Sequence, residues 1–366
     1  MEEGSQSSGD YLVEEDKIMF RVIDLSIKEE KTVYQEIISS QEFHNPYYHI
    51  EYLQQHLNNS NRLVVFLLME KEKCTAILPA VLNPISNTDF WDSTSPYGYS
   101  GPLFKDPKDY QQAPLLWEKV DQWYSENNIV TEFVRFSLNN NHIGYSGNCA
   151  KTLNNVCGNL KDTFELQWGA FGKKVRNNYR KAQTFEINFK LFDEKTLNEK
   201  IIDEFYGIYF KTMQRNNASK FLFFSVEFFY QFILNHKKDF TIGMVYLNGT
   251  PISTELHIHY KDTVYAFLGG ADSDFFHTRP TDYLRVEVIK WAIQNEKKKY
   301  ILGGGIVNDD GLYKSKKAFF PKDEDSIFYT GRKVVNKKLY NDLIKQTLDK
   351  KPELKNDNYF PLYRKP

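Results

Sequence analysis

The hydrophobic and polar positions between residues 264 and 320 predict a strand, a helix and a second strand. Val264 to Leu268 is rich in β-branched and aromatic residues and stops at two glycines, which is typical of a strand that ends in a turn. Apolar residues then recur at helical spacing from Leu284 to Ile293, after a helix start at Pro280. Tyr300 to Leu302 is a second apolar run, which ends at Gly303 to Gly305. Because α/β folds bind ligands where such strands end, we expect a ligand at this glycine turn.

The same patterns along the rest of the chain predict a mixed α/β protein. Two apolar runs at 62–69 and 75–82 flank a charged turn and predict a hairpin, and 240–247, 252–260 and 264–268 predict a meander of three strands. Further strands are expected at 130–136 and 161–166. Helices are expected within 33–57, with a break at Asn45 and Pro46, and at 115–124, 168–183, 201–213, 226–234 and 338–348.

Composition and charge limit the class of protein. The 366 residues allow two or three domains, and 41% hydrophobic residues is enough to form real cores. The 47 Lys and Arg are balanced by 48 Asp and Glu, so no global field attracts DNA or a membrane, and any basic site must be local. No apolar run is long enough to span a bilayer and the first 16 residues are acidic, so we expect a cytoplasmic protein whose residues 1–16 are disordered or a capping extension.

The three cysteines do not indicate a disulfide or metal framework. Their number is odd and their spacing contains no CxxC pair, which favours a reducing compartment and predicts no metal site. Cys157 as a nucleophile stays open as an alternative to a passive thiol.

A row of basic residues marks the centre of the chain. Lys173, Arg176 and Arg180 are spaced by three and four residues, so a helix would place them on one face, and no acidic residue is interleaved. Both an anion-binding face and an ordinary solvated face fit this pattern.

Two further segments carry candidate chemistry. Glu255 lies inside a predicted strand, where alternation puts it on the same face as His257 and His259, and it could be a base in a cleft or a solvated residue of an edge strand. The segment SPYGYSGPLF is a shaped loop in which two Pro and two Gly frame Tyr97 and Tyr99, either to contact a ligand or to cover a core edge.

The lysines that follow the glycine turn also suit an anion. Lys316 and its neighbours come directly after Gly303 to Gly305, so ammonium groups and free backbone N–H groups would meet there, as a phosphate or carboxylate requires. No GxxxxGKS or GxGxxG pattern accompanies them, so neither a P-loop nor a dinucleotide fold is supported.

Taken in order, six motifs resemble one family. PYGYSGPLF, KKVRNNYRKA, STELHIHY, YAFLGGADSDFFHTRPTDYL, WAIQNEKKKYILGGG and GLYKSKKAF resemble the FemAB-type peptidyltransferases, and most closely their GNAT-like branch from cell-envelope and polysaccharide gene clusters. The resemblance covers about residues 66–320. It implies two tandem GNAT-like acyltransferase domains, each a mixed sheet flanked by helices, over residues 17–163 and 164–340, followed by a C-terminal helix and tail over 341–366.

The resemblance also implies an activity and roles for residues. Such proteins transfer an acyl or aminoacyl group from a carrier to an amine of a cell-wall or glycan precursor, with no covalent enzyme intermediate and no tightly bound cofactor. Glu255 is the catalytic candidate, as base or as orienting carboxylate. Tyr97 and Tyr99 would shape the acceptor pocket, and Lys316 would meet a phosphate of the donor. The full set of candidates for substrate binding is Tyr97, Tyr99, Lys173, Arg176, Arg180, Asp272, Arg279 and Lys316.

Departures from the family pattern bear on the carrier. Ser315 replaces the Phe that often precedes the lysine at 316, and no long heptad stretch lies between Lys181 and Phe240 to form the helical arm of members that use aminoacyl-tRNA. The missing arm favours acyl-CoA as co-substrate over aminoacyl-tRNA. Because the Q/RxxGxG/A loop of simple GNAT enzymes is missing as well, the donor stays open. The expected acceptor is a small-molecule, lipid-linked or nucleotide-linked glycan precursor. Peripheral contact with a membrane is compatible with this activity, and DNA is not expected as a partner. The alternatives are an aminoacyl-tRNA-dependent peptidoglycan bridge enzyme and a catalytically silent precursor-binding module.

Overall fold

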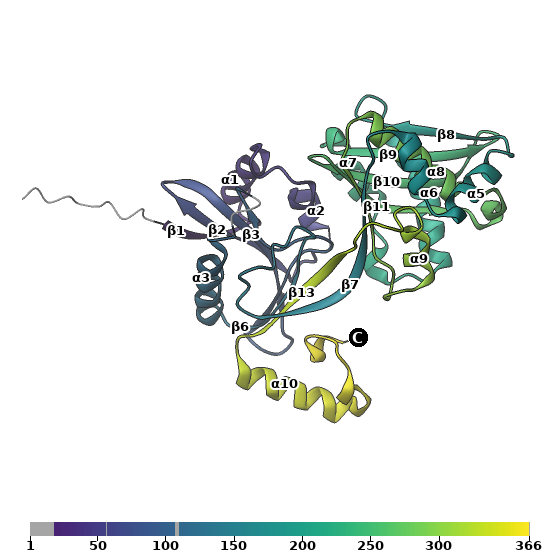
Figure 1. Ribbon diagram of the computed structural model, residues 1–366. Helices are drawn as coiled ribbons and strands as arrows, with labels where there is room; N and C mark the ends of the chain where they lie inside the picture. The colour runs from purple at the N-terminus through teal and green to yellow at the C-terminus, as the bar shows by residue number, and fades with distance from the viewer. Residues whose placement is uncertain (1–17, 56, 107–109, 366) are drawn as a thin grey trace, which may run out of the picture.

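One long mixed sheet organises the molecule. The computed structural model describes residues 18–55, 57–106 and 110–365, so the extension expected over residues 1–16 lies outside the described range. Within it, the strands form a 13-stranded sheet in the order β1-β2-β3-β4-β6-β13-β7-β12-β11-β10-β9-β8, with β5 paired to β3. Figure 1 shows the two ends of this sheet in two lobes, with β7 and β13 running side by side between them. The predicted α/β fold class with mixed sheets is confirmed.

The first lobe is formed by the N-terminal part of the chain. Its helices cover strands that include the predicted hairpin, now β2 and β3, which pair antiparallel around a turn at Lys71 and Glu72. The elements are β1 (Ile18–Asp24), α1 (Lys28–Ser39), η1 (Pro46–Tyr48), α2 (Ile50–Gln54), β2 (Arg62–Glu70), β3 (Lys73–Pro84), β4 (Trp91–Thr94), β5 (Leu103–Phe104), α3 (Ala113–Glu126) and β6 (Ile129–Arg135).

The second lobe repeats the plan of strands flanked by helices. Its strands β9, β10 and β11 form the predicted antiparallel meander, and β11 pairs parallel with β12 after the predicted crossover helix α8. The elements are α4 (Phe164–Ala170), α5 (Lys173–Ala182), β8 (Ile187–Phe192), α6 (Glu199–Arg215), η2 (Lys220–Leu222), α7 (Val226–Leu234), η3 (Lys237–Asp239), β9 (Phe240–Leu247), β10 (Thr250–Tyr260), β11 (Thr263–Ala271), η4 (Ser273–Thr278), α8 (Pro280–Gln294), β12 (Lys299–Gly303) and α9 (Gly311–Lys317).

Two strands that the sequence patterns did not predict connect the lobes. β7 (Asn148–Asn159) pairs with β13 along its first part and with β12 along its last residues, so it belongs to both parts of the sheet. β13 (Ser326–Val334) comes after the second lobe in the sequence, yet it lies between β6 and β7. The domain boundary predicted near residue 163 follows β7 and stays a prediction.

Two local predictions were wrong. The strand expected at 161–166 does not form, because Thr163 accepts a hydrogen bond from the Leu166 N–H and caps helix α4 at this point. The strand expected to stop before Gly269 continues to Ala271, and its last residues, Leu268 to Ala271, stay paired with β10.

One hydrophobic core joins the lobes. Buried side chains of α1, η1 and α2 pack in the same cluster as those of α6 and α7, and the rings of Tyr52 and Phe232 lie 5.3 Å apart. On the opposite face of the second lobe, a separate core packs α8 and α5 against β9 to β12. In the described part of the chain, no helix combines the length and apolar character needed to cross a bilayer.

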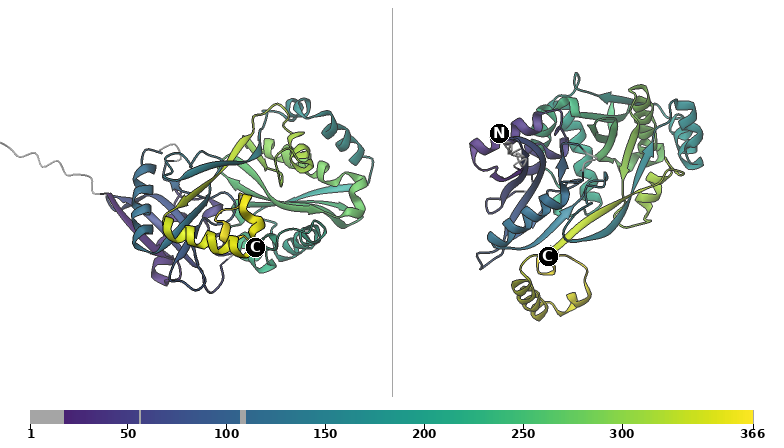
Figure 2. Two further views of the ribbon diagram at one scale, coloured as in Figure 1. Left: turned by 90° about the horizontal axis from the view of Figure 1, so that it is seen from below. Right: turned by 60° about the vertical axis from the view of Figure 1, so that its left-hand side comes forward.

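The C-terminal segment folds back on the first lobe. The predicted helix is confirmed as α10 (Lys337–Lys350), and η5 (Pro352–Asn356) and η6 (Leu362–Arg364) follow it. Figure 2 shows this segment standing off from the sheet and returning to it at its end. The return is held by the buried Asp92 carboxylate, which accepts hydrogen bonds from the Tyr363 hydroxyl at 2.6 Å and from Arg364 Nε at 2.8 Å.

Candidate functional site

The site forms where two parallel strands separate. β11 and β12 pair only over Thr263–Tyr265 and Lys299–Ile301, after which β11 continues beside β10 and β12 ends at Gly303. A cavity of about 330 Å³ lies in this region, lined by the remaining residues of β11 and by side chains from β10, α6, α8 and α9. Strand edges that have lost their partner offer N–H and C=O groups to a ligand. The cavity lies next to the strand end where the sequence predicted a ligand, since Leu302 lines it, and the ligand itself stays a prediction.

Glu255 lies on the wall of the cavity within a network of buried polar groups. It sits on the face of β10 that meets α8, where Arg285 donates to its Oε1 from Nε at 3.2 Å and from Nη2 at 3.0 Å. Its Oε2 accepts from the Tyr300 hydroxyl at 2.8 Å and lies 3.5 Å from His257 Nε2. The side chain is 8% exposed. Glu255 is therefore a buried, fully partnered carboxylate and not the solvated residue of an edge strand.

The electrostatics of Glu255 make it a poor base. Burial raises the pKa of this carboxyl, but the Arg285 guanidinium and His257 outweigh burial and hold the pKa well below its usual range. A general base is most effective when its pKa lies near the working pH. The geometry thus favours the orienting role for Glu255 over the role of proton acceptor.

Lys316 reaches the same cavity from the last turn of α9. Its Nζ donates to the Gly304 carbonyl at 2.7 Å, which fixes the side chain although Ser315 replaces the usual Phe. Burial, together with repulsion from Arg285, lowers the pKa of Lys316 to about 8. The ammonium is thus charged at neutral pH, with two protons left for a ligand.

The glycines of β11 allow close packing instead of forming a turn. A Cβ at Gly269 would lie 2.5 Å from the Thr254 carbonyl oxygen, and one at Gly270 would lie 2.2 Å from Thr212 Oγ1 on α6. Both distances are shorter than any real carbon contact. The absence of side chains lets β11, β10 and α6 approach and shapes the wall of the cavity.

The two tyrosines of the SPYGYSGPLF loop point to different surroundings. The Tyr99 hydroxyl donates to Asn155 Oδ1 at 2.8 Å and lies close to Gly303, beside the cavity. The Tyr97 ring contacts Phe221, with ring centroids 4.7 Å apart, and the Tyr52 hydroxyl donates to its carbonyl. Tyr99 is therefore near the cavity, whereas Tyr97 packs between the lobes.

The basic row lies outside the cavity. Helix α5 exposes Lys173 and Arg180 and half-exposes Arg176, as the spacing predicted. Arg176 donates to the carbonyl of Phe171, and the Arg180 guanidinium lies over the Trp168 ring, 5.4 Å from its centroid. No residue of this row lines the cavity that holds Glu255, within the described chain.

Asp272 and Arg279 flank a short connection between β11 and α8. The Asp272 carboxylate accepts from the Asp274 N–H at 3.1 Å and caps η4. Arg279 is exposed and adopts a left-handed conformation, with φ of 58°, directly before α8. Asp272 thus has a structural function here, and Arg279 is free to meet solvent or a ligand near the start of α8.

Sequence reasoning missed Arg285, Tyr300 and Arg215. Arg285 was hidden in an otherwise apolar helix pattern, and a charge among Leu284, Val286 and Val288 was the signal that could have identified it. Arg215 lies at the end of α6 and donates to the Ala271 carbonyl at 2.8 Å, at the rim of the cavity. No pattern links it to β11 in the sequence.

Burial disfavours the reactive thiolate of Cys74 and of Cys157. Burial raises the pKa of Cys157, and it raises that of Cys74 to about 12, so both thiols stay protonated near neutral pH.

Comparisons with known proteins agree with this geometry. Residues 170–315 match a family described as "Acetyltransferase (GNAT) domain". A comparison of the sequence with curated proteins found no match.

Solved structures with a similar fold are distant in sequence. A structure titled FemX has a TM-score of 0.59 at 9% identity, covering 80% of this chain and 92% of FemX. L-PGS from Bacillus licheniformis has a TM-score of 0.54 at 10% identity, covering 87% of this chain and 95% of that one. The C-terminal domain of a putative lysylphosphatidylglycerol synthetase from Agrobacterium fabrum has a TM-score of 0.50 at 13% identity, covering 75% and 85%.

Glu255 and Arg285 lie within the matched segment, and Lys316 follows directly after its last residue. The similarity to FemX covers 80% of the chain and so includes both lobes. The resemblance inferred from the sequence agrees with both comparisons: residues 170–315 match a GNAT acetyltransferase domain, and the fold of the chain is similar to that of FemX.

Proposed function

We propose that the protein is an N-acyltransferase that moves an acyl or aminoacyl group from an activated carrier, with acyl-CoA favoured, to an amine of a cell-envelope glycan or peptidoglycan precursor. The observation that supports this most directly is the cavity where β11 and β12 separate, whose lining residues except Lys316 fall in the segment that matches the GNAT domain. The titles of the similar structures name FemX and lysylphosphatidylglycerol synthetase, and both fit transfer of an aminoacyl group in the cell envelope.

The chemical step needs few groups from the protein. The acceptor nitrogen attacks the carbonyl carbon, the new C–N bond forms, and the C–S bond to coenzyme A breaks with departure of the thiolate. The nitrogen loses one proton and the thiolate gains one, so no oxidant or second carrier is required. The oxyanion that develops on the carbonyl oxygen is stabilised by hydrogen-bond donors, and unpaired N–H groups at the free edge of β11 can serve this purpose.

The charged groups of the cavity suit recognition more than proton transfer. Glu255 holds Arg285 in place, while Lys316 and Arg215 give the cavity a positive character. A donor that carries phosphates, such as acyl-CoA, meets both cations, and charge-assisted hydrogen bonds of this kind contribute about 1.5–3 kcal/mol each. We assign Lys316 to the donor and Glu255 to the orientation of Arg285.

The region between Lys181 and Phe240 favours acyl-CoA over aminoacyl-tRNA. Here α6 lies on strands β10 and β11, and α7 packs against α6 and α2. These helices form the core that joins the lobes, so the described chain has no protruding arm here of the kind expected for a tRNA-dependent member.

A ligand screen tests the proposal and separates the donors. Thermal shift is measured with a series of acyl-CoAs, with charged tRNA and with nucleotide-linked amino sugars, because a ligand at 100 times its dissociation constant stabilises the native state by about 2.7 kcal/mol. Stabilisation by acyl-CoAs, followed by release of free thiol on addition of the acceptor, supports the acyltransferase. Stabilisation by tRNA alone, with a steep salt dependence, supports the tRNA-dependent enzyme.

The second candidate is a catalytically silent binding module. It predicts that nucleotide-linked amino sugars stabilise the protein while no acyl-CoA does so and no thiol is released. With a competent substrate, Glu255→Gln should lower kcat far more than it raises KM, and unchanged turnover in this variant would remove Glu255 from the active site.

A further inference from the structure

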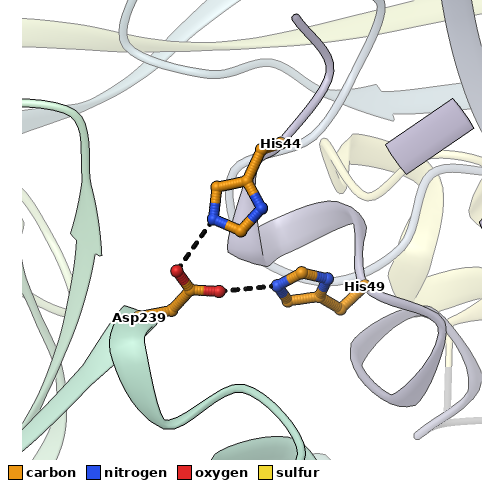
Figure 3. A group of neighbouring side chains, drawn as sticks. All are labelled: His44, His49 and Asp239. Atoms are coloured by element: carbon orange, nitrogen blue, oxygen red, sulfur yellow. Dashed lines mark hydrogen bonds and ion pairs between the residues drawn. The ribbon is translucent and has the colours of Figure 1, made fainter. Parts of the chain in front are cut away.

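A second group of polar side chains lies away from the cavity, at the contact between the lobes. His44 and His49 come from the two sides of η1 in the first lobe, and Asp239 ends η3 in the second lobe. Figure 3 shows that the two imidazoles each turn one ring nitrogen towards a different oxygen of the Asp239 carboxylate. In the sequence, Asp239 lies 195 positions after His44 and 190 positions after His49, so residues that are far apart along the chain converge on one carboxylate.

The side-chain types and distances are those of a metal centre with three protein ligands. His44 Nε2 lies 2.8 Å from Asp239 Oδ1 and His49 Nε2 lies 2.8 Å from Asp239 Oδ2, and all three ligand atoms lie within 4.8 Å of one another. Two ligands of a tetrahedral Zn²⁺ site lie about 3.3 Å apart, given metal–ligand bonds of about 2.0–2.1 Å. Shifts of about 1 Å would thus place an ion between the three atoms. In the described part of the chain, no other group of three His, Cys, Asp or Glu side chains comes this close together.

The surroundings hold two of the three ligands in place. His49 is 5% exposed and stacks on His236, with ring centroids 3.7 Å apart and planes within 6° of parallel. His236 in turn contacts Glu51 through Nε2 at 3.0 Å, which fixes the stack from behind. Asp239 is 9% exposed, so its carboxylate is also confined. Ordered outer contacts of this kind orient metal ligands and strengthen binding.

The third ligand opens the group to solvent. The side chain of His44 is 42% exposed, and it lies at the edge of an open cavity that Asp239 and His236 also line. An ion can therefore enter and keep water in its remaining positions. Lys195, Lys237 and Lys238 line the same cavity, and together they outweigh the carboxylate of Glu194 and repel a cation. This repulsion makes the affinity moderate and leaves the ligand geometry unchanged.

We propose that His44, His49 and Asp239 form a binding site for a divalent transition-metal ion of the Zn²⁺ class, which ties the first lobe to the second. The ion would replace two hydrogen bonds by three coordinate bonds across the contact between the lobes, and it would have no part in acyl transfer. The sequence predicted no metal site, because the cysteines lack ligand spacing and Asp239 is remote from the two histidines along the chain.

Titration of chelator-treated, full-length protein with ZnCl₂ tests the proposal. Isothermal calorimetry should show one ion per chain, and Co²⁺ should give the visible absorption of a site with nitrogen and oxygen ligands. His44→Gln and Asp239→Asn should each weaken Zn²⁺ binding by about 100-fold or more. Removal of a residue that only hydrogen-bonds to a metal ligand already lowers metal affinity by about 10–100-fold, and loss of the ligand itself should cost more. Zn²⁺ should raise the melting temperature of the parent protein and not that of the two variants.

Two control variants separate this site from adventitious binding. His277→Gln removes an exposed histidine that contacts the Asp274 carbonyl and the Phe185 ring, and Cys149→Ser removes an exposed thiol; both variants should bind Zn²⁺ like the parent. Circular dichroism checks that the His44→Gln variant is folded, as we expect because the His44 side chain is half exposed. The proposal is overturned if the parent binds no Zn²⁺, or if His44→Gln and Asp239→Asn bind it as the controls do.

Discussion

Replacement of Glu255 by Gln should destabilise the protein strongly, because it leaves a buried arginine without its partner. Arg285 is 12% exposed and directs two donors to Glu255 Oε1. Breaking a buried ion pair by removal of one partner costs about 3–5 kcal/mol, since the other charge stays buried and uncompensated. Gln keeps the size of the side chain and an oxygen for the Tyr300 hydroxyl, so we expect the low end of this range, about 3 kcal/mol.

Urea unfolding followed by circular dichroism at pH 7 measures this cost. The matched control is Glu204→Gln: this half-buried carboxylate accepts one hydrogen bond from the Tyr246 hydroxyl, and its loss should cost about 0.5–1.5 kcal/mol. In a double-mutant cycle, Arg285→Met should rescue part of the loss in Glu255→Gln, because the uncompensated charge is then gone. A loss in Glu255→Gln no larger than that in Glu204→Gln would refute the reasoning.

The same ion pair sets the response of stability to acid. Because the pKa of Glu255 is lower in the folded state than its ordinary value of 4.5, the unfolded chain binds the proton first as the pH falls. The contribution of the pair is therefore complete above pH 4.5 and is lost as the pH falls below it. Glu255→Gln should remove this part of the acid dependence.

Three further predictions concern other contacts. Because the pKa of Lys316 is about 8, the protein should bind a phosphate-bearing donor less tightly as the pH rises through 8, and the Lys316→Met variant should bind it weakly at every pH. Titration calorimetry measures both affinities, and a parent affinity that does not fall above pH 8 would contradict this role. Asp92→Ala should release the C-terminal segment by removing the acceptor for Tyr363 and Arg364, which limited proteolysis should detect as faster cleavage after residue 336; unchanged cleavage would show that Asp92 does not hold the segment. Arg180→Ala should weaken binding of a phosphorylated acceptor by about 1.5–3 kcal/mol in calorimetry, and no loss would show that α5 is only a solvated face.

Several elements that sequence patterns predicted correctly are buried within their own lobe. β2 and β9 are nearly continuous apolar runs, and α8 places its apolar residues on the sheet, so burial and sequence pattern agree. β7, with the sequence NCAKTLNNVCGN, and β13 carry many polar residues and are only partly buried. They are strands because their neighbours in the sheet offer backbone partners, and a partner remote in sequence leaves no periodicity to find.

The candidate site shows the same limit. Glu255 and Lys316 were identified by residue type next to strand and glycine signals, and the structure brings both to one cavity. Arg285 and Tyr300 were missed because their polar ends meet Glu255 only after α8 has crossed the sheet. Residue type thus indicated which groups carry the chemistry, whereas the pairing that sets their charge depends on tertiary contacts.

The turn at Gly303 brings a side chain of the first lobe close to Lys316. A Cβ at this position would lie 3.7 Å from Lys316 Nζ, 3.8 Å from the Tyr99 hydroxyl and 3.6 Å from Asn155 Oδ1. These three groups come from α9, from the loop after β4 and from β7, and Tyr99 donates to Asn155. The first lobe therefore contributes Tyr99 to the end of β12, where Lys316 of the second lobe also lies. Since β7 carries Asn155 and pairs with strands of both lobes, a shift between the lobes would move Tyr99 relative to Lys316 and change the surroundings of this lysine.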